Sequence, residues 1–301
     1  MSDPVAALKE WKPRNDFLIA IDSDGCAFDT MEIKHKECFI PNIIKYWGLQ
    51  AVSKYARAAA EFVNLYSKWR GVNRFPALLM TVDLLAEWDA PMARGIALPA
   101  MPNLRRWVEN ETKLGNPALK AYCAAHSADD EPDMHTALEW SLAVNRFVED
   151  IVQGGLPPFP YVRECLEKAM GAADMMVCSQ TPGEALEREW AEQDMAKYVF
   201  AINGQEVGTK GEHIQYASEG RYDKTKILMI GDANGDLKAA RKNSALFFPI
   251  NPGDEEASWK RLYEEGLDRF FAGTYAGDYE ASLIAEFDKY LPEVPPWKRA
   301  H

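Results

Sequence analysis

A short apolar run ends abruptly in carboxylates in Phe17-Leu-Ile-Ala-Ile-Asp-Ser-Asp-Gly-Cys-Ala-Phe-Asp-Thr30, the stretch on which the fold of this chain depends. Residues 17–21 are apolar and rich in β-formers, which predicts a buried strand of a parallel sheet. Asp22 and Asp24 follow at the carboxyl end of that strand, the edge at which open α/β sheets bind ligands. Gly25 lets the backbone turn tightly beside them. The same residues also suit a plain polar loop, so their meaning depends on the rest of the chain.

The composition favours a small ligand over a polyanion. The chain has 301 residues, enough for two domains, and 47% of them are hydrophobic. Lys and Arg number 34 against 46 Asp and Glu, a net charge of −12 that disfavours binding to nucleic acid or to an anionic membrane. The size and charge suit a monomer or a homodimer.

The sequence also indicates a reducing compartment. The first fifteen residues lack the apolar segment of a secretory signal, and no run approaches membrane-spanning length, so we expect a cytoplasmic protein. The cysteines are odd in number and scattered, which predicts reduced thiols rather than a disulfide or zinc framework. They are Cys26, Cys38, Cys123, Cys165 and Cys178.

Two kinds of periodicity divide the chain. From Met31 to about Gln153, apolar residues recur every three or four positions, which predicts an all-helical insertion, and the Gly154 to Pro158 stretch predicts a hinge after it. Strands then alternate with helices, and Thr181 is expected to cap one of the helices. The predicted strands are 174–178, 198–202, 226–230 and 245–250, and the predicted helices include 161–171, 212–219 and 236–242.

This alternation predicts an α/β fold with a doubly wound parallel sheet, Rossmann-like, and an inserted all-helical cap domain. Residues 1–32 and 160–301 would form the core domain, and residues 33–159 the cap domain. Apolar helical spacing near the C-terminus, as at Trp259, Leu262 and Phe270, is expected to serve packing or self-association.

Polar side chains follow two further strands. Ser179 follows the 174–178 strand, and Asp232 follows the 226–230 strand with Asp236 four residues later. If these strands neighbour the first one, Asp22, Asp24, Asp232 and Asp236 converge, and a cation must relieve their repulsion. Hard oxygen ligands of this kind suit Mg²⁺ together with a substrate phosphate. Lys210, one short helix upstream, would bring a balancing positive charge.

With these residues the sequence resembles the haloacid dehalogenase superfamily over residues 16–30 and about 172–250. The first motif of the family, Asp-x-Asp-Gly, matches Asp22, Asp24 and Gly25, and its second, a strand ending in Ser or Thr, matches Ser179. The third motif, a Lys, matches Lys210 best, and the fourth, Gly-Asp-x-x-x-Asp, matches residues 231–236. The insertion after the first motif is where the family places its helical cap of the first type.

The resemblance implies a role for each matched residue. Asp22 would attack phosphorus to form an aspartyl-phosphate, and Asp24 would act as general acid and then general base. Ser179 and Lys210 would stabilise the transferred phosphoryl group. Mg²⁺ would be held by Asp22, by the backbone carbonyl of Asp24 and by Asp232, with Asp236 as a further ligand or support. Gly25 and Gln180 would contact the substrate.

Several neighbouring residues have more than one interpretation. Lys224 and Lys226 lie closer to the 226–230 strand than Lys210 does, but a Lys just before a strand is usually solvated. Cys26 stands where the family commonly has Thr and is expected to be a packed thiol. In the basic half of the insertion, Arg70 and Arg74 are candidates to bind a substrate carboxylate or phosphate, or else belong to a solvated basic face.

Hydrolysis of a phosphomonoester is the leading functional interpretation, because Asp24 supplies the acid and base that dehalogenase-like members lack. The expected partner is a small phosphorylated metabolite. A sugar-phosphate mutase of the phosphoglucomutase kind is an alternative, and it would need a cap that excludes water. A regulatory domain that binds Mg²⁺ and phosphate without turnover is another, although such a domain needs neither a lid nor protonation of a leaving group.

Overall fold

The computed structural model describes residues 4–152 and 155–298 of the chain. These residues divide into two compact units. We call residues 4–31 and 155–290 the core unit, and residues 32–152 and 291–298 the helical unit.

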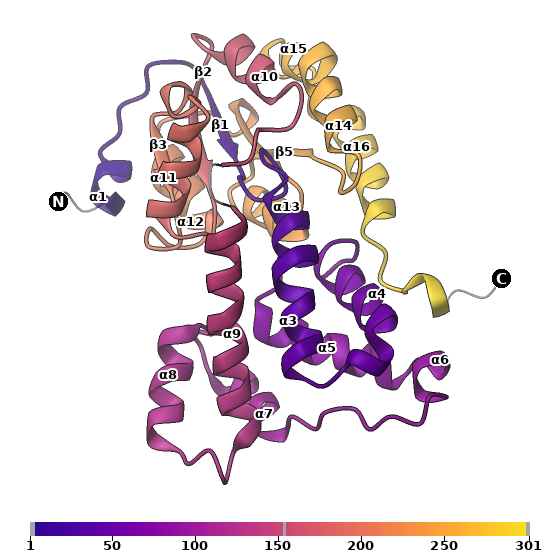
Figure 1. Ribbon diagram of the computed structural model, residues 1–301. Coiled ribbons are helices and arrows are strands. Elements are labelled where there is room, and N and C mark those ends of the chain that lie inside the picture. Colours follow the sequence, from indigo (N-terminus) through magenta and orange to yellow (C-terminus); the bar gives the residue numbers. More distant parts are fainter. Residues whose placement is uncertain (1–3, 153–154, 299–301) are drawn as a thin grey trace. The chain divides into compact units, whose positions relative to one another are not determined.

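A parallel sheet of five strands in the order β3-β2-β1-β4-β5 forms the centre of the core unit, with helices around it (Figure 1). In the register of the sheet, Ile21 of β1 pairs with Val177 of β2 and with Ile230 of β4. The carboxyl ends of β2 and β4 therefore flank that of β1, and the predicted α/β class is confirmed. The strands are β1 Phe17–Ile21, β2 Ala173–Cys178, β3 Ala201–Asn203, β4 Ile227–Gly231 and β5 Leu246–Pro249.

Alternate residues of each strand serve opposite faces of the sheet. Ile19 and Ile21 pack in one core cluster with Leu166 of α10, Trp190 of α11 and Trp259 of α14. Helices α12, α13 and α16 contact strands β2, β4 and β5, respectively. The helices of this unit are α1 Pro4–Lys9, α10 Val162–Ala169, α11 Gly183–Glu192, α12 Lys210–Ser218, α13 Asn234–Lys242, α14 Glu255–Arg261, α15 Leu267–Phe271 and α16 Asp278–Tyr290.

Every named element between residues 34 and 151 is helical, as the apolar spacing predicts. Trp140 is fully buried in the hydrophobic core of this unit, and its ring meets those of Phe39 and Phe75 edge to face. After α2 Thr30–Ile33, the elements are a π-helix over Lys34–Phe39, α3 Ile40–Tyr46, a 3₁₀-helix over Gln50–Val52, α4 Ser53–Asn64, α5 Arg74–Ala86, α6 Asp89–Met92, α7 Pro102–Asn110, α8 Asn116–Ala125 and α9 Pro132–Ile151.

The C-terminal segment 291–298 groups with the helical unit, whereas the expected division assigned it to the core domain. The indole of Trp297 stacks on that of Trp88, with 4.1 Å between ring centroids and 5° between planes. The amide of Lys68 also donates to the carbonyl oxygen of Pro292 at 3.4 Å. The spacing of apolar residues does not predict this grouping of residues 291–298, because it does not indicate which unit an aromatic side chain packs against.

Three local expectations differ from the structure. Strand β3 begins at Ala201 rather than at residue 198, because residues 196–198 form a turn of 3₁₀-helix. Helix α11 begins at Gly183 without a side-chain cap, so the prediction that Thr181 caps it is wrong. The first residue of the predicted hinge, Gly154, lies outside the described residues. All five cysteines are free and buried, as expected.

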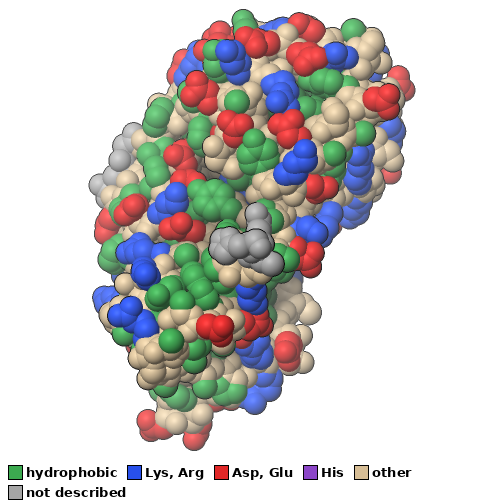
Figure 2. Space-filling model, turned by 90° about the vertical axis from the view of Figure 1, so that its right-hand side faces the viewer, with side chains coloured by type: hydrophobic (Ala, Val, Ile, Leu, Met, Phe, Trp, Pro, Cys, Tyr) green, Lys and Arg blue, Asp and Glu red, His purple; other side chains and the backbone are tan. Residues whose placement is uncertain are grey.

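Acidic and basic side chains are interspersed on the face drawn in Figure 2. The large apolar side chains that remain exposed in the described ranges are Met92, Phe147, Ile151, Met170 and Val294. Within those ranges, the helices are too short or too polar to cross a membrane.

Candidate active site

The loop after β1 turns back immediately, and this fixes the position of Asp22. Its backbone amide continues the sheet by donating to the carbonyl oxygen of Ile230 at 3.0 Å. The amide of Ser23 donates to Oδ1 of Asp22 at 2.8 Å. Gly25 has φ +75°, and its amide donates to the carbonyl oxygen of Phe28 at 2.8 Å, which closes the turn. Asp22 is left 4% exposed at the carboxyl edge of the sheet.

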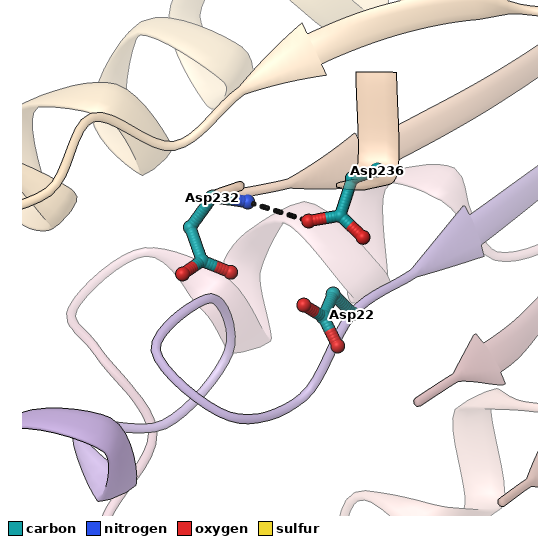
Figure 3. Close-up of side chains that lie close together, drawn as sticks. All are labelled: Asp22, Asp232 and Asp236. Atoms are coloured by element: carbon teal, nitrogen blue, oxygen red, sulfur yellow. Dashed lines mark hydrogen bonds between the residues drawn. The ribbon is translucent and has the colours of Figure 1, made fainter. Parts of the chain in front are cut away.

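Three carboxylates converge at this edge. Asp22, Asp232 and Asp236 are buried, and each offers an oxygen such that the three oxygens lie within 4.8 Å of one another (Figure 3). Asp236 comes from the first turn of α13, and its Oδ2 accepts hydrogen bonds from the amides of Asp232 at 3.2 Å and Ala233 at 3.1 Å. Of the four aspartates predicted to converge, these three do so, because strands β1 and β4 are adjacent, whereas Asp24 is not part of the group.

Lys210 lies among these acids. Its Nζ is 2.6 Å from Oδ2 of Asp22 and 2.6 Å from Oδ1 of Asp236. Thr209 and Glu212 form a capping box at the start of α12. This cap fixes the backbone of Lys210, the first residue of the helix. Lys226 is instead paired with Asp16 at 3.3 Å, at the opposite end of the sheet.

The charges of this cluster do not balance. Burial raises the pKa of Asp22 well above its usual value, Lys210 opposes that shift, and Asp236 and Asp232 add to it. Burial lowers the pKa of Lys210, but Asp22, Asp236 and Asp232 more than offset this, so the net pKa is well above the usual value. With the carboxyls ionised, three carboxylates and one ammonium group leave two negative charges. Hard oxygen donors with this excess fit one Mg²⁺ ion.

Asp24 has surroundings of its own. Its side chain is half-buried, Oδ1 accepts a hydrogen bond from the hydroxyl of Thr30, and Oδ2 accepts one from the hydroxyl of Thr181 at 2.6 Å. Sequence reasoning missed both threonines, since it used Thr181 as a helix cap. The sequence did not indicate that β2 pairs with β1, and this pairing is what brings Thr181 next to Asp24. Two hydroxyl donors fix both oxygens of the Asp24 carboxyl.

The loop after β2 adds two more of the predicted site residues, Ser179 and Gln180, to the carboxyl edge of the sheet. Ser179 is 2% exposed, and its amide donates to the carbonyl oxygen of Asn203 at 3.0 Å. Its Oγ accepts a hydrogen bond from the amide of Thr181 at 3.2 Å, which leaves its own proton available to a ligand. Nε2 of Gln180 donates to the carbonyl oxygen of Gly208 at 2.9 Å and so joins this loop to the one before Lys210.

Cys26 is a packed thiol, as expected. It is fully buried, and its Sγ donates to the carbonyl oxygen of Ile230 at 3.7 Å. Burial raises the pKa of this thiol well above its usual value, and the neighbouring Asp232 and Asp22 raise it further. A thiol of this kind is a poor nucleophile.

The two candidate arginines belong to the helical unit. Arg70 is 4% exposed, and its Nη1 donates to the carbonyl oxygen of Leu65 at 2.8 Å. Nη1 of Arg74 donates to Oγ of Ser141 at 2.9 Å and to Oδ1 of Asn145 at 2.8 Å. Contacts of these arginines with a substrate stay a prediction.

Comparison with known proteins finds similarity in solved structures alone. No protein-family profile matches the chain, and no curated protein matches it. A haloacid dehalogenase-like hydrolase from Streptococcus pneumoniae is 14% identical, covers 90% of this chain and 98% of its own, and has a TM-score of 0.43. A hydrolase of the same superfamily, subfamily IA, from Geobacter sulfurreducens is 14% identical over 78% and 89%, with a TM-score of 0.41.

L-2-haloacid dehalogenase from Xanthobacter autotrophicus is 14% identical to this chain, over 85% and 86% of the two chains, with a TM-score of 0.38. The structure of this chain itself brings Asp22, Asp232 and Asp236 together and sets Lys210 between Asp22 and Asp236. In its motifs, its sheet edge and its helical insertion, the chain resembles the haloacid dehalogenase superfamily.

Proposed function

We propose that this chain is a Mg²⁺-dependent phosphomonoester hydrolase of the haloacid dehalogenase superfamily. The observation that carries the proposal is the buried group of Asp22, Lys210 and two further acids at the carboxyl edge of the sheet. A nucleophilic carboxylate, a fixed cation and an excess of negative charge in one place suit phosphoryl transfer, in which positioning and charge neutralisation supply most of the catalysis.

In the first step, a carboxylate oxygen of Asp22 attacks phosphorus, and the bond from phosphorus to the ester oxygen breaks. Lys210 holds Asp22 at 2.6 Å and neutralises charge on the phosphoryl oxygens. Ser179 donates its hydroxyl proton to one of those oxygens. Asp24 gives a proton to the leaving oxygen, so an alcohol departs and an aspartyl-phosphate remains on Asp22.

In the second step, Asp24 takes a proton from water, and the hydroxide attacks phosphorus to release inorganic phosphate and restore Asp22. The hydroxyl groups of Thr30 and Thr181 hold the carboxyl group of Asp24 in position for both proton transfers. Asp22 and Asp232 would hold the Mg²⁺ ion, with Asp236 and the backbone of Asp24 beside them, and the ion would neutralise non-bridging oxygens.

The test is phosphate release from a panel of phosphomonoesters, with and without Mg²⁺, by the wild type and by Asp22→Asn. We expect Mg²⁺-dependent release by the wild type and at least a 10³-fold loss in the variant, because the covalent route is removed. Asp16→Asn is the matched control, since the same change falls on an exposed carboxylate at the other end of the sheet.

A second readout is independent of turnover. Titration with Mg²⁺ should raise the melting temperature of the wild type, and Asp232→Asn should abolish that rise. A mutase would release little phosphate and would exchange phosphoryl groups between sugar phosphates. A regulatory domain would bind Mg²⁺ but turn over no ester, and either result would overturn the proposal of a hydrolase.

A further inference from the structure

Residues 22–28 form the turn that follows β1, and we call this segment the β1 turn. Ser23 is fully buried in it, and its amide donates to Oδ1 of Asp22 at 2.8 Å. The carbonyl oxygen of Ser23 accepts a hydrogen bond from the amide of Phe28 at 3.1 Å, and its carbonyl carbon is bonded to the backbone nitrogen of Asp24. The position of Ser23 therefore decides both the orientation of the Asp22 carboxylate and the backbone position of Asp24.

A tryptophan of α11 holds the side chain of Ser23. Trp190 is fully buried, and its Nε1 donates to Oγ of Ser23 at 3.0 Å, while that hydroxyl donates to Oε2 of Glu189 at 3.2 Å. The indole ring also meets the ring of Phe28 edge to face, with 5.6 Å between centroids. A buried N–H group without an acceptor raises the free energy of the fold, so Trp190 favours the position of Ser23 that provides an acceptor.

A tryptophan of α14 holds the other half of the same turn. Trp259 is fully buried, and its Nε1 donates to the carbonyl oxygen of Cys26 at 2.8 Å. Trp190 and Trp259 both pack in the core cluster that contains Ile19 and Ile21 of β1. An indole has a single N–H donor and no acceptor, so each of these two side chains commits its one hydrogen bond to the β1 turn.

Burial of an indole ring in this chain does not by itself give its N–H group an acceptor. Trp47 and Trp140 are buried in the helical unit, and among the described residues the Nε1 atom of each has no hydrogen-bond partner. The two tryptophans that contact the β1 turn are both paired, at ordinary N–H···O distances of 3.0 Å and 2.8 Å. Their pairing is therefore a property of this turn rather than a general result of packing a tryptophan.

We propose that Trp190 and Trp259 are positioning residues, whose indole N–H groups fix the β1 turn and thereby orient Asp22 and Asp24 for phosphoryl transfer. The effect on phosphoryl transfer rests on the proposed function, whereas the support of the turn does not. Loss of an indole N–H should lower kcat and leave KM unchanged, because a misplaced carboxylate slows attack on phosphorus without removing a contact to the substrate.

Hydrogen exchange of the β1 turn tests the support without any substrate. The variants are Trp190→Phe and Trp259→Phe, each measured at the same interval below its melting temperature. The matched control is Tyr275→Phe, because Tyr275 is fully buried in the same core cluster and its hydroxyl donates to the carbonyl oxygen of Phe247 at 2.8 Å. We expect the amides of residues 25–28 to exchange at least tenfold faster in both tryptophan variants and at the wild-type rate in Tyr275→Phe. A wild-type rate in either tryptophan variant would remove that residue from the proposal.

Ser23→Ala separates the hydrogen bond from the volume of the ring, and it keeps the test valid if Trp190→Phe does not fold. It removes the acceptor of the indole and leaves the ring in place, so it should speed exchange of the β1 turn by the same factor as Trp190→Phe. The double variant should be no faster than either single variant, because both changes remove the same hydrogen bond. Factors that multiply in the double variant, or a wild-type rate in Ser23→Ala, would overturn the support by the indole N–H group.

Turnover tests the effect on phosphoryl transfer. With the phosphomonoester that the wild type cleaves best, kcat should fall at least tenfold in Trp190→Phe and in Trp259→Phe, KM should stay within twofold, and Tyr275→Phe should keep both constants. A raised KM at unchanged kcat, unchanged values of both, or an equal fall of kcat in Tyr275→Phe would refute the positioning role and leave the hydrolase intact. Faster exchange of the β1 turn in the variants of a protein that cleaves no ester would refute the hydrolase and leave the support of the turn.

Discussion

Gly231 has no side chain because Asp236 occupies the space that one would need. A Cβ atom built at Gly231 would lie 2.4 Å from Cβ and from Cγ of Asp236, much closer than carbon atoms approach. Asp236 in turn binds Lys210 and the amides of Asp232 and Ala233. The acidic cluster therefore requires a residue without a side chain at Gly231, the Gly of the Gly-Asp-x-x-x-Asp motif.

Gly231→Ala should displace the Asp236 carboxylate and weaken Mg²⁺ binding at least tenfold, because one acid and the position of Lys210 are both disturbed. The measurement is the Mg²⁺ concentration at which the melting temperature is half-shifted. Gly235→Ala is the control, since a Cβ at Gly235, in the first turn of α13, meets nothing within 4 Å. An unchanged half-shift concentration in Gly231→Ala would show that the cluster tolerates the methyl group.

Thr181 should govern the second half-reaction. Thr181→Val removes a hydroxyl donor to Asp24, so the carboxyl group is less well oriented to take a proton from water. We expect hydrolysis of the aspartyl-phosphate to slow by about tenfold, within the range of general-base effects. Rapid-quench experiments would then detect more phosphorylated enzyme in the steady state. Thr181→Ser keeps the hydroxyl and should behave as the wild type, and a matching loss in Thr181→Ser would assign the effect to packing.

At the scale of single elements, α12 carries both Lys210 and a fully buried histidine, His213. Burial lowers the pKa of His213 to about 4 from an ordinary value of 6.5. Above pH 6.5 the ring is neutral in the folded and unfolded states and has no effect on stability. As the pH falls from 6.5 toward 4, the unfolded state takes up a proton that the folded state does not, so stability falls.

His213→Leu should remove this pH dependence. Between pH 7.5 and pH 4.5 the free energy of unfolding of the wild type should fall by about 2 to 3 kcal/mol more than that of the variant. Urea unfolding at both pH values measures the difference, and the comparison cancels carboxyl groups that titrate in both proteins. Parallel losses in the two proteins would mean that the ring is protonated in the fold or that another group dominates.

The strands and helices that carry the motifs were predictable because each has a strong local signal. Phe17–Ile21 is apolar throughout and ends in acids, and the structure has β1 over the same residues. Thr181 shows the limit of such signals. A Thr-Pro-Gly-Glu sequence is a good helix start, but the hydroxyl of Thr181 bonds Asp24, 157 residues away in the chain, and no local pattern contains that partner.

The role of Arg74 was open for the same reason. Its sequence neighbours indicate a basic face, whereas its surroundings in the structure come from α9, through Ser141 and Asn145, and from the π-helix, through Phe39. Basic composition identifies the charge, but packing alone identifies these partners.

At the scale of the whole molecule, the chain passes between its two units three times, near residues 31, 153 and 290. The insertion by itself requires two passages. The third exists because α16 ends at Tyr290 and segment 291–298 belongs to the helical unit, where Leu291 is 1% exposed. Movement of one unit against the other therefore has to be accommodated by three connections.

Trp297 should anchor this third connection. Besides stacking on Trp88, its ring meets that of Phe62 edge to face with centroids 5.8 Å apart, so Trp297→Ala removes two aromatic contacts. Loss of these contacts and of the buried area should lower the stability of the helical unit by about 1 to 3 kcal/mol. Hydrogen exchange followed by mass spectrometry should then be faster in α4, in α5 and around Trp88, while β1, β2 and β4 keep the rates of the wild type.

Lys298→Ala is the control for Trp297→Ala. It removes only the exposed ion pair with Glu87 and should change stability by at most about 1 kcal/mol. Faster exchange in both units of Trp297→Ala would mean that the units unfold together, and the segment would then be a part of one cooperative core. Unchanged exchange everywhere would mean that the stacked indoles contribute nothing to holding 291–298 in place. Acceleration confined to the helical unit identifies the segment as a tether whose release leaves the carboxyl edge of the sheet, with its three aspartates, intact.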